Sequence, residues 1–481
     1  MKKIFLVLLI LLLPSMGWCA TYYVSPTGND SADGAIGTPW LTPSTSAAKL
    51  SAGDTLYFRG GSYTDTAQLD VAAANITLKA YTGETPIVSS PNAINFGDAS
   101  DGGILDGITF IRSTGATVIV AIGDDHITVQ NCDLSYGETP YASGAGDAIR
   151  PIGAHANHGI LIYNNIIHHC GENGIDGSTN YYDGAGASDG GGEWSVIVRG
   201  NTVYDCGSYG IMFKGGADGV LIEKNTVSGC RYGQIDLGNT CTGDVALSET
   251  HHVTNAVIRN NYLYGACTYN GMEATYYQAI VLKSVKDVYI YNNTSLLGGV
   301  IISRIEDDMY NAAGVLLGNE NIYIYNNLFY VTASGPDLFT WHQRDGVYAD
   351  GQPAHDAHTL ADTPASVKPT SLYAAYNIFV NLAAGTTLYK ENNTDGAISW
   401  ATFSTNNPDL VGGSTQYTDG NTTVKLDGVA SGSEDLDLQS DSPLINAGNN
   451  KIGSTSKNGK PRPSGHGMDI GAYEVEGGMI R

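Results

Sequence analysis

Residues 160–165 read Ile160-Leu161-Ile162-Tyr163-Asn164-Asn165, a short alternating apolar strand that leads to asparagine, and this pattern decides the fold. Another apolar pair follows it, and the whole pattern recurs along the chain. The repeats lie at residues 127–131, 196–201, 220–225, 257–261, 288–293, 322–327 and, in weaker form, 372–377. Alternating apolar and polar side chains are typical of a half-buried β-strand. The chain is therefore predicted to repeat one β unit many times.

The spacing of the asparagines indicates how the units are built. Counted from Asn131, the intervals run from 24 residues (Asn201 to Asn225) to 50 residues at the end of the series. We interpret the shortest interval as one bare coil of three short strands, and the longer ones as the same coil with inserted loops. Gly107, which lies 24 residues before Asn131, marks an earlier coil. The pattern predicts an all-β fold, a single-stranded parallel β-helix that is right-handed by the rule for parallel crossovers.

Two kinds of side chain recur at fixed places in the predicted coils. An asparagine amide both donates and accepts hydrogen bonds, so stacked asparagines are expected to form an interior ladder rather than a sugar or calcium site. Cys170, Cys206 and Cys230 each follow their asparagine by five residues. We expect these thiols to stack at about 4.8 Å, buried and unpaired, although a disulfide is geometrically conceivable.

The charge of the chain limits its partners. The sequence has 48 acidic and 24 basic residues, a formal net charge of −24, and loss of Lys2 and Lys3 would leave 22 basic residues and a charge of −26. Such a surface repels nucleic acid and anionic lipid. It also repels a polyuronate unless a cation or a local basic groove intervenes. Nucleic acid is therefore not a predicted partner, and we expect a monomer.

The N-terminus has the pattern of a signal peptide. Lys2 and Lys3 precede an unbroken apolar run from Ile4 to Leu13, which is too short to cross a bilayer and does not recur. The predicted organisation is a signal peptide at 1–20 and one β-helix domain at 21–481. Within that domain we expect an N-terminal cap at about 21–70 and a closing segment at about 430–476. The protein is predicted to be secreted, extracellular or periplasmic, without a membrane span.

Three segments resemble known proteins. Residues 22–30 and 53–63 resemble the opening of secreted bacterial β-helix proteins of the pectin lyase-like fold, including family 9 pectate lyases. The middle of the chain is similar to the general parallel β-helix repeat, and residues 442–448 and 469–474 are similar to a closing coil common in such proteins. The resemblance implies a right-handed β-helix that acts on carbohydrate, by β-elimination of an acidic polysaccharide or by hydrolysis of a glycoside.

Basic and acidic side chains recur near strand ends in successive coils. We expect the basic ones to form a stripe on one long face and the acidic ones to supply oxygen ligands for Ca²⁺, partly from a Gly-rich insertion. The candidate catalytic residues are Arg150, Lys214 and Lys283, and the candidate metal ligands are Asp147, Asp176, Asp183, Asp189 and Asp236. For the two lysines, the alternative interpretation is a solvated turn cation, and for Asp183 and Asp189 it is a polar loop.

A lyase acting on a polyuronate must remove the proton at C5, next to the carboxylate. A cation on that carboxylate acidifies the proton, while a lysine or arginine takes it. The resemblance to family 9 pectate lyases implies a lysine base beside an aspartate-bound calcium, and Lys214 is the position that best matches. The leading hypothesis is therefore a calcium-assisted lyase on a pectate-like or alginate-like polysaccharide.

Two other functions remain open from the sequence. A glycoside hydrolase needs two carboxylates across the scissile bond, and Glu306, Asp307 and Asp308 lie together near the end of a coil. A non-catalytic extracellular protein that binds glycan through its long face also fits the acidic composition. The histidines, including His168 and His169, do not have the spacing of zinc ligands, so a transition-metal site is not expected.

Overall fold

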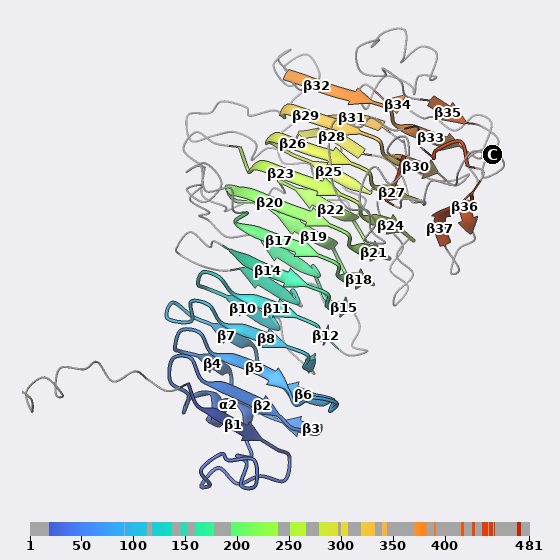
Figure 1. The fold of residues 1–481 in the computed structure, drawn as a ribbon. Coiled ribbons are helices and arrows are strands. Elements are labelled where there is room, and N and C mark those ends of the chain that lie inside the picture. Colours follow the sequence, from blue (N-terminus) through green and yellow to red (C-terminus); the bar gives the residue numbers. More distant parts are fainter. Residues whose placement is uncertain are drawn as a thin grey trace, which may run out of the picture.

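The computed structural model shows a solenoid of three parallel β-sheets that run the length of the molecule (Figure 1). It describes residues 19–90, 92–112, 118–136, 146–151, 159–177, 194–238, 251–265, 279–296, 300–305, 319–331, 339–343, 370–381, 389–390, 415–417, 426–428, 435–440, 442–445, 447 and 469–472. The predicted signal sequence up to residue 18, Asp183 and Asp189 lie outside these residues. One strand of each sheet comes from each coil, as the interval of 24 residues predicts.

The first sheet has 12 strands. In order, they are β1 (Thr21–Val24), β2 (Thr55–Phe58), β5 (Thr77–Ala80), β8 (Ile104–Asp106), β11 (Thr128–Gln130), β14 (Ile160–Tyr163), β17 (Val196–Arg199), β20 (Ala217–Glu223), β23 (Val253–Arg259), β26 (Val285–Tyr291), β29 (Glu320–Tyr325) and β32 (Thr370–Ala375).

The second sheet has 11 strands and carries the candidate site. In order, they are β4 (Leu69–Val71), β7 (Ile94–Phe96), β10 (Val120–Ile122), β13 (Ile149–Pro151), β16 (Ile175–Gly177), β19 (Tyr209–Phe213), β22 (Gly233–Leu237), β25 (Ile280–Leu282), β28 (Val300–Ile305), β31 (Phe339–Gln343) and β34 (Tyr389–Lys390).

The third sheet also has 12 strands. They are β3 (Gly61–Thr64), β6 (Pro86–Ser90), β9 (Thr109–Arg112), β12 (Asp133–Ser135), β15 (Ile166–His168), β18 (Thr202–Tyr204), β21 (Thr226–Ser228), β24 (Tyr262–Tyr264), β27 (Thr294–Ser295), β30 (Leu328–Val331), β33 (Ile378–Asn381) and β35 (Thr415–Tyr417). Outside the three sheets, the short helix α2 (Pro43–Ala47) lies near the N-terminal end, and β36 (Leu426–Gly428) pairs antiparallel with β37 (Asp435–Leu438).

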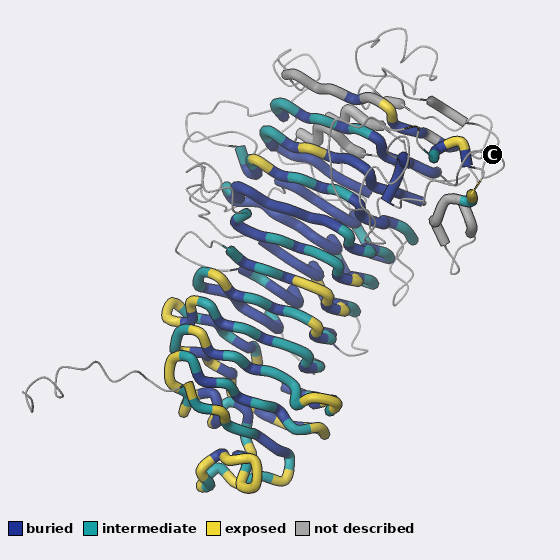
Figure 2. Tube along the Cα trace, viewed as in Figure 1, coloured by how far each residue is buried: buried dark blue, intermediate teal, exposed yellow. Residues whose placement is uncertain are grey.

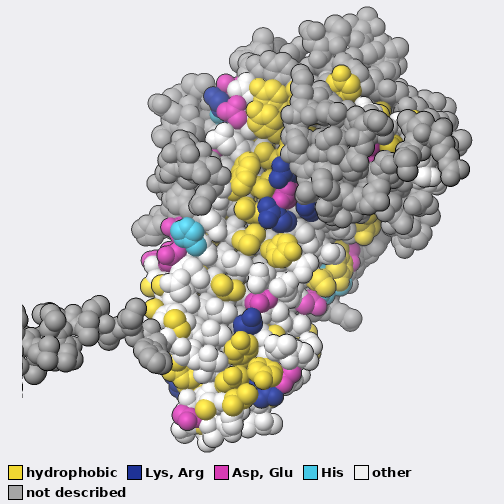
Figure 3. Space-filling model, viewed as in Figure 1, with side chains coloured by type: hydrophobic (Ala, Val, Ile, Leu, Met, Phe, Trp, Pro, Cys, Tyr) yellow, Lys and Arg dark blue, Asp and Glu magenta, His cyan; other side chains and the backbone are white. Residues whose placement is uncertain are grey.

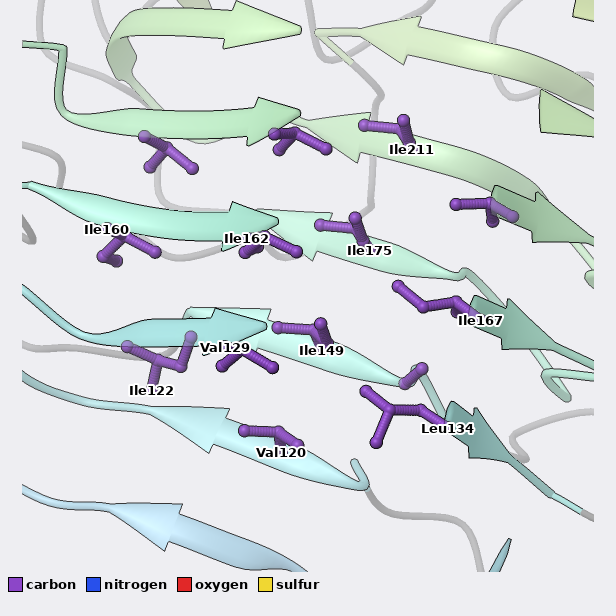
Figure 4. Close-up of a cluster of buried hydrophobic side chains, with 14 of the residues drawn as sticks. Val120, Ile122, Val129, Leu134, Ile149, Ile160, Ile162, Ile167, Ile175 and Ile211 are labelled. Carbon is purple, nitrogen blue, oxygen red and sulfur yellow. The ribbon is translucent and has the colours of Figure 1, made fainter. Parts of the chain in front are cut away.

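The core is a column of apolar side chains enclosed by the three sheets (Figures 2 and 4). Each coil stacks its inward residues on equivalent residues of the next coil, as Ile160 pairs with Val196 and Val196 with Val220. Those side chains are fully buried. Because every coil buries its apolar face only on its neighbours, the fold extends along one axis without needing a larger core.

The asparagine ladder lies inside the turn between the first and third sheets. The backbone N–H of Asn165 donates to Asn201 Oδ1 at 2.9 Å, and Asn201 Nδ2 donates to the Ile162 carbonyl at 2.9 Å. The same bonds repeat from coil to coil through Asn225, Asn261, Asn293, Asn327 and Asn377. The predicted structural role of the asparagines is confirmed from Asn165 onward.

The prediction that Asn131 belongs to this ladder is wrong by one residue. Cys132 occupies the ladder position in its coil, since its backbone N–H donates to Asn165 Oδ1 at 2.9 Å. Asn131 instead has a left-handed backbone (φ 55°), as Gly107 does one coil earlier (φ 75°). Two different asparagine positions sit side by side in four of the eight coils from Asn131 to Asn377, and in this coil only the first is present.

The cysteine stack is confirmed. Cys170, Cys206 and Cys230 follow paired strands of the third sheet, are buried, and are free thiols, as is the buried Cys132. Burial raises the pKa of Cys132 to about 12, which keeps that thiol protonated. In the part of the chain that the structure describes, no helix is long and apolar enough to cross a membrane.

Candidate functional site

The described candidate residues gather on the second sheet. Strand pairing aligns Asp176 on β16 with Met212 on β19, and Met212 with Asp236 on β22. Arg150 on β13 is adjacent to Asp176, because the preceding residues Ile149 and Ile175 are paired. Asp176 and Asp236 are therefore two strands apart, about 10 Å at the usual strand spacing. Lys214 and Lys283 follow the ends of β19 and β25.

These side chains point away from the helix core. In β19, Ile211 and Phe213 belong to the core cluster, so Met212 and Lys214 alternate to the outer side. The same alternation places Arg150, Asp176 and Asp236 outward, since their neighbours in each strand are core residues. The three candidate bases thus share the outer side of one sheet, but not one row. Arg150 lies level with Met212, whereas Lys214 and Lys283 lie two positions further along.

Arg150 lies between two carboxylates. Its Nη1 is 3.7 Å from Asp147 Oδ2 and its Nε is 4.0 Å from Asp176 Oδ2. The side chains of both aspartates are almost fully buried, whereas 37% of the Arg150 side chain is exposed. Asp147 is also tied into the coil above it, because its Oδ1 accepts hydrogen bonds at 2.9 Å from both the backbone N–H and Nδ2 of Asn173.

A third carboxylate, Glu172, belongs to this group. Burial raises the pKa of Asp147, the Glu172 carboxylate adds to the shift, and Arg150 and the Asn173 hydrogen bonds oppose it. Desolvation and the Asp176 carboxylate raise the pKa of Glu172, and the charges of Arg150 and Lys214 oppose that shift. Burial first, and the charge of a neighbouring carboxylate second, therefore oppose ionisation, most clearly at Asp147, since Glu172 is exposed at the surface.

Lys214 joins the same electrostatic group. Its charge acts on Glu172, one coil below it. Only 5% of Lys214 is exposed, so the residue is buried on the outer side of the sheet rather than in the core. One lysine, one arginine and three carboxylates thus lie near one another over β13, β16 and β19.

Asp236 and Lys283 form a separate pair. Lys283 Nζ lies 2.8 Å from Asp236 Oδ2 and 3.4 Å from the Tyr209 hydroxyl, and both charged side chains are at most 1% exposed. A lysine held in a buried ion pair is poorly placed to act as a base, and its aspartate is poorly placed to bind a metal. This contact gives both residues a structural role and separates them from the group around Arg150.

Sequence reasoning did not identify Glu172 and Asn173. The available signal was the segment Glu172-Asn173-Gly174-Ile175-Asp176, in which polar residues flank the start of β16. Asp183 and Asp189 remain predictions, because they lie outside the described residues. Among the residues that are described, no group of three or more His, Cys, Asp or Glu side chains is arranged to hold a metal ion.

Comparison with known proteins agrees with this architecture. Residues 86–242 and 119–275 match the family model described as a right handed beta helix region. The chain is a right-handed parallel β-helix. Over 74 residues, 14% of this chain, it is 39% identical to the pectate lyase PEL9 of Emericella nidulans, and the match spans 18% of that relative's length. This match confirms the resemblance to pectate lyases that the sequence indicates.

Three solved structures align with this chain at low sequence identity. Pectate lyase Pel9A is 15% identical, with a TM-score of 0.46 and coverage of 96% of this chain and 97% of its own. The PL6 family polysaccharide lyase Pedsa3628 from Pseudopedobacter saltans is 13% identical, with a TM-score of 0.47 and coverage of 79% and 92%. XylC, solved with xylose, is 11% identical, with a TM-score of 0.45 and coverage of 78% and 86%.

Proposed function

We propose that the protein is a secreted polysaccharide lyase that cleaves an anionic, pectate-like or alginate-like chain by β-elimination. The observation that carries the proposal is the meeting of Lys214, Arg150 and three carboxylates on the outer side of the second sheet. The partial match to a pectate lyase supports it. Acidic residues outnumber basic ones 48 to 24 in the chain, so a local basic pair offers an anionic chain a place to bind.

Lys214 would act as the base. Its unprotonated amine takes the proton at C5, which is acidified by the adjacent carboxylate group. The electron pair of that C–H bond forms the C4–C5 double bond, and the glycosidic C4–O bond breaks with its electron pair on the leaving oxygen, which takes a proton from water. Arg150, whose side chain is 37% exposed, is placed to pair with the substrate carboxylate. Lys283 is left out of this mechanism because it is paired with Asp236.

Calcium is part of the proposal. Asp147, Glu172 and Asp176 are not arranged as a ready metal site, so their carboxylates would have to turn toward a shared ion to hold it. Carboxylate oxygens suit Ca²⁺, and a divalent cation would offset the burial and the repulsion that raise the pKa of Asp147 and Glu172. Water and substrate oxygens would complete the shell. When bound, Ca²⁺ would withdraw charge from the substrate carboxylate and so acidify the proton at C5. Asp183 and Asp189 stay as further proposed ligands.

A non-catalytic glycan-binding protein is the second candidate. The observation that favours it is the burial of Lys214, which is only 5% exposed and could stabilise the acidic group without meeting substrate. Elimination, hydrolysis and binding alone differ in the fate of the glycan. Elimination creates an unsaturated sugar that absorbs ultraviolet light, hydrolysis creates reducing ends without that absorbance, and binding creates neither.

The test follows ultraviolet absorbance over time with pectate and alginate, in Ca²⁺ and in chelator. We expect the absorbance to rise with pectate or with alginate, and the rise to stop in chelator. The rate of the rise should be at least 100-fold lower in Lys214→Ala, the usual loss when a general base is removed. Lys286→Ala is the matched control, because Lys286 is an exposed lysine paired with Glu320 on another sheet. Equal loss in both variants, or no absorbance with any anionic glycan, would overturn the proposal.

A further inference from the structure

A second polar cluster lies on the third sheet, away from the proposed active site. It consists of Asp133 at the start of β12, His168 at the end of β15, His169 directly after it, and Asp205 directly after β18. Three successive coils contribute to it, since β12 pairs with β15 and β15 with β18. We call His168 and His169 the histidine pair.

Each imidazole of the histidine pair faces a carboxylate on one side and the other imidazole on the other. His168 Nε2 lies 3.0 Å from Asp133 Oδ1, and His169 Nε2 lies 4.0 Å from Asp205 Oδ2. The two Nδ1 atoms lie 2.5 Å apart. This arrangement resembles the outer support of metal-binding histidines, in which the far ring nitrogen donates its N–H to a carboxylate.

Asp133 lies within hydrogen-bond distance of His168 Nε2, whereas Asp205 lies 4.0 Å from His169 Nε2, an ion-pair distance, so the tautomer is set most directly in His168. A neutral imidazole that donates Nε2–H to a carboxylate has a lone pair on Nδ1. When His169 takes the same tautomer as His168, the two Nδ1 lone pairs face each other at close range and repel, so a cation between them would stabilise the arrangement. A metal ion with bonds of about 2.0–2.1 Å to each nitrogen would part the rings by less than an ångström, to about 3.3 Å in tetrahedral geometry.

The backbone brings consecutive side chains to the same place. His169 has a left-handed backbone (φ 54°), and so has Asp205 (φ 54°) at the same position in the next coil. The coil after that has Gly229 there (φ 63°), the residue for which this conformation is cheapest. A histidine and an aspartate therefore occupy positions that favour glycine, and this turn directs the imidazole of His169 toward that of His168.

The histidine pair is reachable from solvent and well supported. The side chains of His168 and His169 are 19% and 25% exposed. The ring of Tyr204 stacks on His168, with 4.9 Å between centroids and 3° between planes. A small cation can enter, and one ring is already held in place.

We propose that the histidine pair binds one divalent transition-metal cation, such as Zn²⁺ or Ni²⁺, through the two Nδ1 atoms, with Asp133 and Asp205 orienting the rings. Nitrogen ligands select these metals over Ca²⁺. The described residues form no group of three ligands here, so water completes the coordination. Spacing along the chain does not predict this site, because adjacent histidines lack the spacing of zinc motifs.

The test is calorimetric titration of Zn²⁺ into the full chain, purified without a histidine tag and stripped with chelator. His169→Asn removes the imidazole and keeps a residue that tolerates a left-handed backbone. His126→Asn is the matched control, because His126 has the same φ of 54° and pairs with Asp101 at 2.8 Å. Wild type and His126→Asn are expected to bind one Zn²⁺ equally, and His169→Asn at least tenfold more weakly.

A second measurement needs no variant. Nuclear magnetic resonance of imidazole-labelled wild type is expected to show Zn²⁺ shifting the ring signals of His168 and His169 but not that of His126. Absence of one-to-one binding by wild type, an equal loss in His126→Asn, or unshifted signals of the histidine pair would overturn the proposal. The last result would mean that a shared proton, not a metal, holds the rings together.

Discussion

The tandem asparagines divide two tasks between adjacent residues. The first residue of each pair takes the left-handed turn, as Asn164 (φ 54°) and Asn260 (φ 56°) do, and the second turns inward to the ladder. Asparagine tolerates the left-handed region better than most residues, and its amide satisfies buried backbone groups. Where the first residue is not asparagine, glycine serves well, whereas Lys224 and Tyr376 adopt the conformation against their preference.

Removing a ladder amide should destabilise the protein. Asn225 Oδ1 accepts from both the backbone N–H and Nδ2 of Asn201, and its own Nδ2 donates to the Val198 carbonyl. Asn225→Ala leaves these buried groups without partners, at about 1–3 kcal/mol for each unsatisfied group, so we expect a loss of about 2–4 kcal/mol. Thermal denaturation followed by circular dichroism measures it.

The control for this experiment is Asn131→Gly. Asn131 has the left-handed backbone but lies exposed, outside the ladder, and glycine keeps the turn. We expect a change in the melting temperature of less than a third of that in Asn225→Ala. A loss of similar size in both variants would mean that the turn, rather than the interior amide, supplies the stability.

Sequence reasoning recovers the recurring residues better than the unique ones. The asparagines and cysteines repeat at a fixed register, so their stacking could be predicted, although Asn131 was placed one residue away from the ladder. Glu172 could not be found, because it occurs once and its importance comes from Asp176, Arg150 and Lys214 on neighbouring strands. Spacing along the chain does not encode which loop residues meet across coils.

At the scale of elements, the first sheet carries a charged row across β17, β20 and β23. Strand pairing places Arg199, Glu223 and Arg259 side by side, and Figure 3 shows basic and acidic side chains gathered on this face. Glu223 is buried and accepts from Arg199 Nε at 2.5 Å and from Arg259 Nε at 2.6 Å. One carboxylate thus joins three consecutive strands.

This row should make stability depend on pH. Burial opposes ionisation of Glu223, but Arg259 and Arg199 outweigh it and lower its pKa below the ordinary value of 4.5. A carboxyl with a lowered pKa in the folded state stabilises the protein above that ordinary value, and the stabilisation is lost as pH falls through the folded-state pKa. Glu223→Gln should therefore cost about 1–3 kcal/mol at pH 7, less than a fully buried pair because solvent screens the arginines.

Melting temperatures of wild type and Glu223→Gln between about pH 3 and pH 7 check this sign. The difference should be largest at neutral pH and should shrink as pH falls below the ordinary pKa towards the lower folded-state pKa, where wild type loses the charge. Glu320→Gln is the control, since its ion pair with Lys286 is 36% exposed on both sides. A difference that stays constant with pH would contradict the assignment of the effect to the charge of Glu223.

The elements also show why the fold was easier to predict than the site. Three strands per coil follow from the shortest interval and the apolar alternation, both of which are local. The expected basic stripe has its residues on one side of the sheet but not in one row, because Arg150 lies within β13 whereas Lys214 follows β19. The strands end at different places, and that depends on packing between coils.

For the whole molecule, the excess of acidic residues sets the electrostatic background. With 48 acidic and 24 basic residues, the folded chain repels itself. A solenoid keeps its surface charges along one axis, and each coil is held mainly by its two neighbours. Repulsion is therefore spread over all coils and is screened by any salt, whereas the group of Asp147, Glu172 and Asp176 is local and partly buried.

Salt and calcium should consequently stabilise the protein in distinguishable ways. Raising NaCl from about 10 to 200 mM shortens the Debye length from about 30 Å to below 10 Å, so the melting temperature should rise. Calcium chloride at matched ionic strength should raise the melting temperature further if the carboxylate group binds Ca²⁺. The free energy of unfolding should then rise by about 2.7 kcal/mol at a hundredfold excess of Ca²⁺ over the dissociation constant. Asp176→Asn should keep the response to NaCl and lose the extra response to Ca²⁺. Equal shifts in NaCl and CaCl₂ for wild type would show that screening alone acts and would remove calcium from the proposed mechanism.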